Sequence, residues 1–212
     1  MQFDLSMTDE LLATTRAVRK RLDLERPVQR DTILECLQLA VQAPNGGNRQ
    51  LWRWLVIDDT DVKREMGKIY HVAAETYFAE SVPKGSHRAD EQTSRIFDSW
   101  RWLVDNLENV PFLLIPCVER VLDKDASLEK TSSFFGSIFP AIWSFQLALR
   151  SRGLGSTITT LHLMESQRSA ELLGIPEGIT QIAMLPIAYT KGTDFKRATR
   201  PPVETITHWN KW

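Results

Sequence analysis

The sequence predicts one domain in which helices cover a sheet, and three observations support this. The chain has 212 residues, which is close to the length of a single domain. Apolar runs at 52–57, 111–118 and 181–189 have the length of strands, and the second is apolar throughout, as in a sheet covered on both faces. Residues 134–152 are apolar nearly all round, which predicts a central helix.

Composition narrows the class of protein. Lys and Arg number 26 and Asp and Glu 27, and this balance argues against nucleic acid or an anionic membrane as the main partner. Cys36 and Cys117 lie within apolar patterns, so we expect them to be reduced and buried. The sequence shows no signal peptide and no apolar run near the ~20 residues that a membrane span needs. It therefore predicts a cytoplasmic protein.

The N-terminal half predicts three helices, a strand and a loop. The helices cover 6–15, 31–43 and 60–79, and their candidate N-caps are Ser6 or Thr8, Asp31, and Asp59 or Thr60. The strand covers 52–57. Residues 80–95 are polar and contain Pro83 and Gly85, so they form a candidate lid.

The C-terminal half contains the central helix and a long tail. We expect a helix from Ile96 to Leu107 and a surface loop over 119–131. Pro140 predicts either a kink in the central helix or a helix that begins near Ile138, and Gly153 ends it. A short helix at 165–174, a turn at 175–178 and a final strand at 203–209 follow.

Two segments contain candidate binding residues. Arg16 and Arg19 belong to a cationic run that is either a solvated surface or an anion site, because guanidinium groups bind phosphate in a bidentate manner. The segment 43–52, A-P-N-G-G-N-R-Q-L-W, is either an ordinary connection or a loop against a flat ligand. Its glycines permit close approach, and Asn48 and Gln50 carry both donors and acceptors.

At other positions the residues alone do not decide between a structural role and a binding role. Residues 153–163, G-L-G-S-T-I-T-T-L-H-L, are compatible with a strand or with a shelf for a ligand. Lys196, Arg197 and Arg200 in the tail are further candidates for phosphate binding. Helical aromatic residues after the lid either form core or shape a pocket; they are Phe97, Trp100 and Trp102.

The sequence lacks the motifs of a self-contained catalyst. The histidines show no zinc spacing, and there is no nucleophile elbow, phosphate-binding P-loop or dinucleotide fingerprint. What remains are segments suited to holding a planar, phosphate-bearing molecule, and if such a cofactor carries the reaction, the protein needs to supply only orientation and electrostatics.

Taken together, these segments resemble the FMN-dependent nitroreductase family over essentially the whole chain. The resemblance rests on T-R-A-V-R at 15–19, the segment 43–52, G-L-G-S at 153–156, L-G-I-P-E-G at 173–178, L-P-I-A-Y at 185–189 and R-P-P-V-E-T-I-T-H-W at 200–209. It implies an α+β fold over residues 1–212, with a mixed, mainly antiparallel sheet wrapped by helices. It also implies an intertwined homodimer, a helical excursion at 80–110 and a tail at 193–212 across the partner.

The resemblance implies an FMN site shared by two subunits. Arg16 and Arg200 would bind the phosphate, and Arg19 would approach the ribityl chain and the flavin pyrimidine, where a cation stabilises negative charge. The segment from Pro44 to Asn48 would face the partner's FMN, and Thr157 and Ile158 would lie beside the ring. The full set of implied FMN-binding residues is Arg16, Ala17, Val18, Arg19, Pro44, Asn45, Gly46, Gly47, Asn48, Gln50, Thr157, Ile158, Thr159 and Arg200. Ala17 stands where the family usually has Ser, Thr15 and Asn45 replace Arg and Ser, and Leu51 replaces Pro.

The implied activity is a ping-pong reduction. NAD(P)H would reduce the bound FMN, and a nitroaromatic, quinone or similar acceptor would then take the electrons at the same place. Reductive dehalogenation or flavin-dependent dehydrogenation on the same scaffold, and a non-catalytic flavin-binding protein, are the alternatives. No metal is expected.

Overall fold

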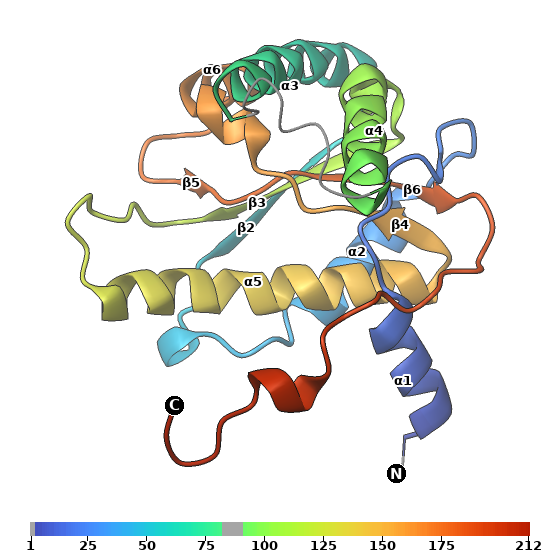
Figure 1. The fold of residues 1–212 in the computed structure, drawn as a ribbon. Helices are drawn as coiled ribbons and strands as arrows, with labels where there is room; N and C mark the ends of the chain where they lie inside the picture. Colours follow the sequence, from blue (N-terminus) through green and yellow to red (C-terminus); the bar gives the residue numbers. More distant parts are fainter. Residues whose placement is uncertain (1–2, 82–90) are drawn as a thin grey trace.

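A computed structural model describes residues 3–81 and 91–212 (Figure 1). The sheet is formed by β1 (Leu22–Asp23), β2 (Trp52–Ile57), β3 (Phe112–Val118), β4 (Leu154–Ser156), β5 (Thr180–Gln181) and β6 (Leu185–Thr190). The α-helices are α1 (Leu5–Thr14), α2 (Arg30–Ala40), α3 (Thr60–Ser81), α4 (Glu91–Asn106), α5 (Leu128–Ser151) and α6 (Ser166–Leu173). Short 3₁₀ helices are η1 (Gly46–Asn48), η2 (Leu107–Asn109), η3 (Leu161–Glu165) and η4 (Val203–Ile206).

The sheet confirms the predicted α+β class. Its main order is β1-β6-β3-β2, with β4 also paired to β6 and β5 to β3. All the strand pairs are antiparallel, and a parallel bridge joins Ala17 to Ser156. The sheet is therefore mixed but mainly antiparallel.

Helices cover both faces of the sheet, as the apolar strand predicted. All seven residues of β3 are buried. Alternate side chains such as Leu114 pack with α2 and α5, whereas Leu113 and Ile115 pack with α3 and α4 on the other face. Figure 1 shows α5 on one side of the sheet and α3 on the other. Cys36 lies in the first core and Cys117 in the second, and both are free and buried.

The central helix is longer than the sequence predicted. α5 begins at Leu128 rather than Phe134, so the surface loop covers 119–127 only. It continues through Pro140, which makes the predicted start near Ile138 wrong. Gly153 follows the helix with φ +75°, as expected of a glycine that ends a helix. By length and apolar composition α5 could cross a membrane, but here it packs against α2 and the sheet as a core helix.

Helix ends correct several predicted caps. Asp4 caps α1 by accepting a hydrogen bond from the Met7 amide at 3.1 Å, whereas Ser6 and Thr8 lie inside the helix. Gln29 precedes α2, so Asp31 lies in its first turn, and the helix ends at Ala40. Asp59 caps α3 as predicted.

The structure differs from the prediction at two other elements and describes a third only in part. Residues 80–81 and 91–95 are helical, and the middle of the predicted lid, residues 82–90, lies outside the described residues. The strand predicted at 181–189 is divided between β5 and β6. The strand predicted at 203–209 is wrong, because residues 203–206 form η4.

Candidate functional site

The cationic segment at 15–19 begins where α1 ends, at its C-cap Thr15, whose backbone is extended. The hydroxyls of Thr14 and Thr15 donate to the Glu10 and Leu11 carbonyls at 2.7 and 2.6 Å. The Val18 amide then donates to the Ser156 carbonyl at 2.9 Å. This pairing places Arg16 and Arg19 beside the residues that follow β4.

Gly155 is needed for this close approach. A β-carbon at Gly155 would lie 2.8 Å from the Thr190 methyl carbon and 2.9 Å from the Val18 β-carbon. Both distances are shorter than packed side chains tolerate. The glycine in G-L-G-S therefore allows the 15–19 segment to pair with β4.

A cavity of about 970 Å³ opens beside these segments. We call it the arginine cavity, because the described residues that line it include five arginines and no aspartate or glutamate. They are Leu12, Ala13, Thr15, Arg16, Ala17, Arg19, Arg95, Ile96, Ser99, Trp143, Gln146, Thr157, Ile158, Arg197, Ala198 and Arg200. Its size is within the range of small-molecule sites.

The charges in this cavity favour an anionic ligand. Partial burial lowers the pKa of the Arg19 guanidinium, and the group is still charged at neutral pH. Arg16 donates to the Lys196 carbonyl at 3.0 Å, and Arg200 donates to its neighbour's carbonyl at Thr199. Neither they nor Arg19 form an ion pair with a described residue. Unpaired guanidinium groups around one space attract phosphate or carboxylate.

The rest of the wall is held by buried polar contacts. Gln146 of α5 donates to the Ser156 hydroxyl at 3.0 Å, and both residues are buried. Thr157 is only 1% exposed, and Ile158 packs against the core that contains α5. The structure confirms a strand at Leu154–Ser156, and Thr157 and Ile158 after it line the cavity; the ligand shelf stays a prediction.

A second space of about 490 Å³ adjoins the first, and we call it the aromatic cavity. It shares Arg19, Ile96 and Ile158 with the arginine cavity. Its remaining lining is Tyr77, Phe97, Trp100, Thr159, Thr160, Leu161 and Met164. Trp100 donates to the Tyr70 hydroxyl at 3.3 Å, which in turn lies 2.8 Å from the Thr159 hydroxyl. Phe97 and Trp100 line this cavity, whereas Trp102 does not; Trp100 and Trp102 both pack, partly buried, against the core.

Contacts with Phe195 position the tail that supplies two of the arginines. The guanidinium carbons of Arg21 and Arg150 lie 4.1 and 4.5 Å from the Phe195 ring centroid. Arg21 also pairs with Asp194 at 2.6 Å, and Arg150 donates to the Thr193 carbonyl. We call this group the tail clamp: Arg21, Arg150, Asp194 and Phe195. It holds the chain just before Arg197 and Arg200.

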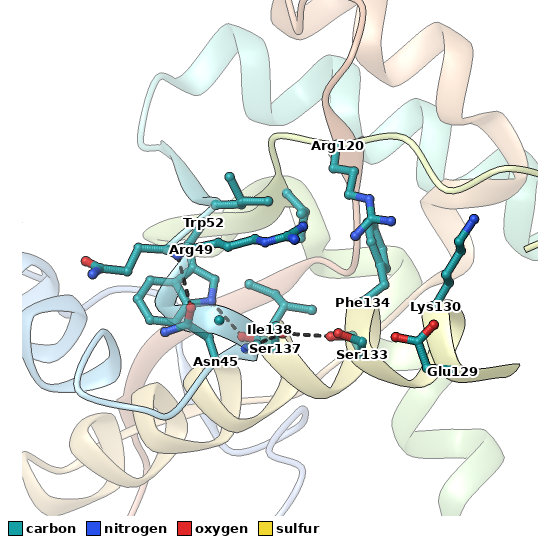
Figure 2. A pocket seen from close by; sticks show the side chains of 15 residues that line it. Asn45, Arg49, Trp52, Arg120, Glu129, Lys130, Ser133, Phe134, Ser137 and Ile138 are labelled. Carbon is teal, nitrogen blue, oxygen red and sulfur yellow. Dashed lines mark hydrogen bonds between the residues drawn. The ribbon is translucent and has the colours of Figure 1, made fainter. Parts of the chain in front are cut away.

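The loop at 44–50 lies apart from the arginine cavity within one chain. η1 contacts α5, and Gly46 lies near Ser133 and Ser137 in the N-terminal half of that helix, whereas β4 follows the C-terminal end of α5 (Figure 1). The loop borders a third space of about 330 Å³, the loop cavity, whose lining is Asn45, Gly46, Gly47, Arg49, Gln50, Leu51, Trp52, Val118, Arg120, Glu129, Lys130, Ser133, Phe134, Ser137 and Ile138 (Figure 2). The Gly46 amide donates to the Ser137 hydroxyl at 2.9 Å, and Asn48 accepts from Gln50.

The structure places eleven of the fourteen predicted site residues at the three cavities. The arginine cavity brings together Arg16, Ala17, Arg19, Thr157, Ile158 and Arg200. Thr159 lines the aromatic cavity, and Asn45, Gly46, Gly47 and Gln50 line the loop cavity. The side chain of Val18 points into the core, and neither Pro44 nor Asn48 lines a described cavity.

Sequence reasoning missed several lining residues. Trp143 and Gln146 come from the central helix, and Arg95, Ile96 and Ser99 come from α4. An amide inside so apolar a helix was a usable signal for Gln146. Lys196 was a candidate, but it contributes its carbonyl to Arg16 rather than its ammonium to the cavity. Among the described residues no cluster could hold a metal ion.

The chain therefore has an α+β fold with a mainly antiparallel sheet, and its arginine-lined cavity, which lies beside an aromatic one, has the size and charge to suit a small anionic ligand. The sequence matches the Nitroreductase family over residues 12–189, and the chain belongs to this family of oxidoreductases. The expectation drawn from the sequence motifs is thereby confirmed.

The proteins to which this chain is similar include both deiodinases and nitroreductases. The chain is 26% identical to iodotyrosine deiodinase from Thermotoga neapolitana over 94% of this chain and 96% of that protein. A crystal structure of oxidized iodotyrosine deiodinase bound to FMN and 3-iodo-L-tyrosine superposes with a TM-score of 0.72 at 22% identity, covering 96% of this chain and 99% of that one. The FMN-dependent nitroreductase NfnB from Mycobacterium smegmatis, in complex with NADPH, gives a TM-score of 0.69 at 16% identity, covering 98% and 100%.

Proposed function

We propose that this chain is a cytoplasmic FMN-dependent oxidoreductase that uses NAD(P)H to reduce a small aromatic acceptor. The observation that carries this proposal is the arginine cavity, with five arginines and no described carboxylate, next to a cavity walled by aromatic rings. This donor set fits FMN, which has a phosphate at one end and a planar ring system at the other. The family membership and the FMN-bound neighbour support the same cofactor.

The chain's own residues would hold the cofactor in three ways. Arg16 and Arg200 would bind the phosphate, since both line the cavity and neither has an acidic partner among the described residues. Arg19 would stabilise negative charge on the ring, and its partial burial strengthens that interaction by reducing screening by water. Thr157 and Ile158 would form the wall beside the ring, because the buried Gln146–Ser156 contact fixes the residue before them.

Bound FMN would supply hydride and electron transfer in two half-reactions, first from NAD(P)H and then to the acceptor. The protein would contribute orientation and exclusion of water. Tyr77, Phe97 and Trp100 offer flat apolar surfaces next to Arg19 for a nicotinamide or an aromatic acceptor. Nitroaromatics and quinones are the proposed acceptors.

We further propose that the functional unit is a homodimer with the tail across the partner. Phe135, Phe139 and Trp143 recur at four-residue intervals on α5 and are 38%, 36% and 42% exposed, which is unusual for large apolar residues on a core helix. Trp209 and Trp212 in the tail are 84% and 100% exposed. In such a dimer the segment from Pro44 to Asn48, together with Gln50, would complete the FMN site of the other subunit.

Absorbance and kinetics together test the proposal. The purified protein should be yellow, with flavin absorbance bands, and should oxidise NADH or NADPH when a nitroaromatic or quinone is present. A colourless preparation that does not take up added FMN would refute the cofactor assignment. A yellow protein that oxidises neither nucleotide with any acceptor would refute the reductase and leave a flavin-binding protein.

Reductive dehalogenation is the second candidate, and the deiodinase relatives favour it. Both reactions need an aromatic ring against the flavin, so the cavities alone do not separate them. Release of halide from halophenols and iodotyrosine, measured beside nitroaromatic reduction in the same preparation, distinguishes the two. A higher kcat/KM for the halogenated series would identify a dehalogenase.

A further inference from the structure

The partners of the arginines in this chain indicate a second anion site. Many arginines pair with a carboxylate; these include Arg21, Arg30, Arg53, Arg64, Arg101, Arg152 and Arg168. Arg26 lies over the Tyr189 ring, and Arg150 over Phe195. Among the described arginines, those without an acidic or aromatic partner line a cavity in every case. Arg16, Arg19, Arg197 and Arg200 line the arginine cavity, and Arg49 and Arg120 line the loop cavity.

The loop cavity has an excess of positive charge. Arg49, Arg120 and Lys130 line it, and the described carboxylate there is that of Glu129. Figure 2 shows the side chains of Arg49 and Arg120 extending into the same space from separate segments, with Lys130 on the first turn of α5. The N-terminal end of α5 adds a partial positive charge on this side. Two guanidinium groups therefore line one small space beside the first turn of α5.

The floor of the loop cavity is apolar and rigid. Trp52, Phe134 and Ile138 are 8%, 4% and 0% exposed. The Trp52 indole donates to the Ser137 carbonyl at 2.7 Å, which fixes its ring. At about 330 Å³ the space is at the lower end of the range for small-molecule sites, so it suits a single ring.

The backbone beside the cavity adopts conformations that side chains normally avoid. Asn48 and Gln50 have φ of +51° and +52° although neither is glycine. The Gln50 amide donates to the Asn45 side chain at 3.0 Å, which helps to hold this shape. Strained positions of this kind are concentrated at functional sites.

We propose that the loop cavity binds the carboxylate of a small aromatic acid, with Arg49 and Arg120 on the carboxylate and the ring on the apolar floor. The assignment of this acid as an acceptor rests on the proposed function, in which the adjoining loop faces the partner's flavin. The binding site itself does not depend on that function. A neutral amide of the same shape cannot form the two charged hydrogen bonds and binds more weakly.

Titration calorimetry of the purified protein, as isolated, with benzoate and with its neutral isostere benzamide tests the site directly. Wild type should bind benzoate at least tenfold more tightly than benzamide. Arg120→Gln and Arg49→Gln should each weaken benzoate binding by roughly tenfold, the loss expected for one charged hydrogen bond. Arg53→Gln is the matched control, because Arg53 lies on the neighbouring β2, pairs with Glu119 and does not line the cavity, so benzoate affinity should change less than twofold.

Several outcomes would overturn the proposal. Benzoate that does not bind, that binds no better than benzamide, or that binds equally to wild type and to both loop-cavity variants excludes the site. Flavin absorbance and melting temperature, recorded for every variant, show that each is folded. A colourless wild type would refute the FMN proposal, yet its benzoate titration would still decide the anion site. The acceptor role is supported if Arg120→Gln lowers kcat/KM for 4-nitrobenzoate but not for 4-nitrobenzamide, and is refuted if both fall equally.

Discussion

Acid should destabilise this protein through His162. The side chain is fully buried in η3, and neither ring nitrogen has a hydrogen-bond partner among the described residues. Burial lowers the pKa of His162 to about 4 from its ordinary 6.5, because a charged imidazolium would lose its hydration there. The unfolded chain therefore binds a proton that the folded chain excludes across this pH range.

The sign and size of the effect follow from these two pKa values. Between pH 6.5 and about 4 the unfolded state carries more protons, so the free energy of unfolding decreases as the pH falls. From pH 7 to pH 5 the loss is about 2 kcal/mol, and it approaches about 3 kcal/mol below pH 4. Replacement by leucine removes the titrating group and its unpaired nitrogens, so His162→Leu should reduce this slope and raise stability at pH 5.

Urea unfolding at fixed protein concentration, followed by tryptophan fluorescence at pH 7 and pH 5, measures the effect. His71 on α3 is exposed, so His71→Leu is the matched control and should keep the wild-type pH dependence. If His162→Leu loses as much stability as wild type between these pH values, the buried neutral histidine is not the cause. Equal slopes in all three proteins would refute the reasoning.

Three further outcomes are expected. Arg200→Ala should weaken FMN binding roughly tenfold or more but leave riboflavin binding unchanged, because riboflavin lacks the phosphate; equal losses in equilibrium dialysis would contradict the phosphate role. Gly155→Ala should cost about 1–3 kcal/mol of stability, since its new β-carbon would overlap Val18 and Thr190, and an unchanged urea midpoint would show that the contact relaxes freely. Phe139→Glu should shift the protein toward monomer in sedimentation velocity by placing a charge on the exposed face of α5, and a monomeric wild type would exclude the proposed dimer.

Elements set by local pattern could be predicted from the sequence. Trp52–Ile57 has the predicted bounds because an apolar run lies between a turn and a capping aspartate, Asp59, whose side chain accepts from the amides of Asp61 and Val62. The continuous burial of β3 likewise followed from its composition. In both cases the neighbouring residues already contained the information.

Elements set by distant contacts could not be predicted. Residues 182–189 form one mainly apolar run, yet the Ile182 amide donates to the Pro116 carbonyl and the Met184 amide to the Thr159 carbonyl, so the strand is interrupted at points that only the tertiary fold defines. The two-residue strand β1 exists because Leu22 and Asp23 pair with β6, and its own residues carry no strand pattern.

The residues of the candidate site likewise divide into those that the sequence could predict and those that it could not. Charged groups such as Arg16 and Arg200 were visible in the sequence, and the structure places both at one cavity although they lie far apart in the chain. Trp143 was not visible as a site residue, because it lies within a helix whose apolar residues predict only a core. Its exposure follows from the way α5 lies against the sheet.

Because of the tail clamp, most of the conformational entropy lost in ordering the C-terminal segment is lost on folding rather than on ligand binding. The Phe195 contacts fix the backbone just before Arg197 and Arg200, so if these arginines bind a phosphate, little further ordering of the chain is needed. If the same segment also crosses to a second chain, each subunit would order part of the other subunit's FMN site before FMN binds. Dilution of the protein would then dissociate the dimer and release FMN in the same step.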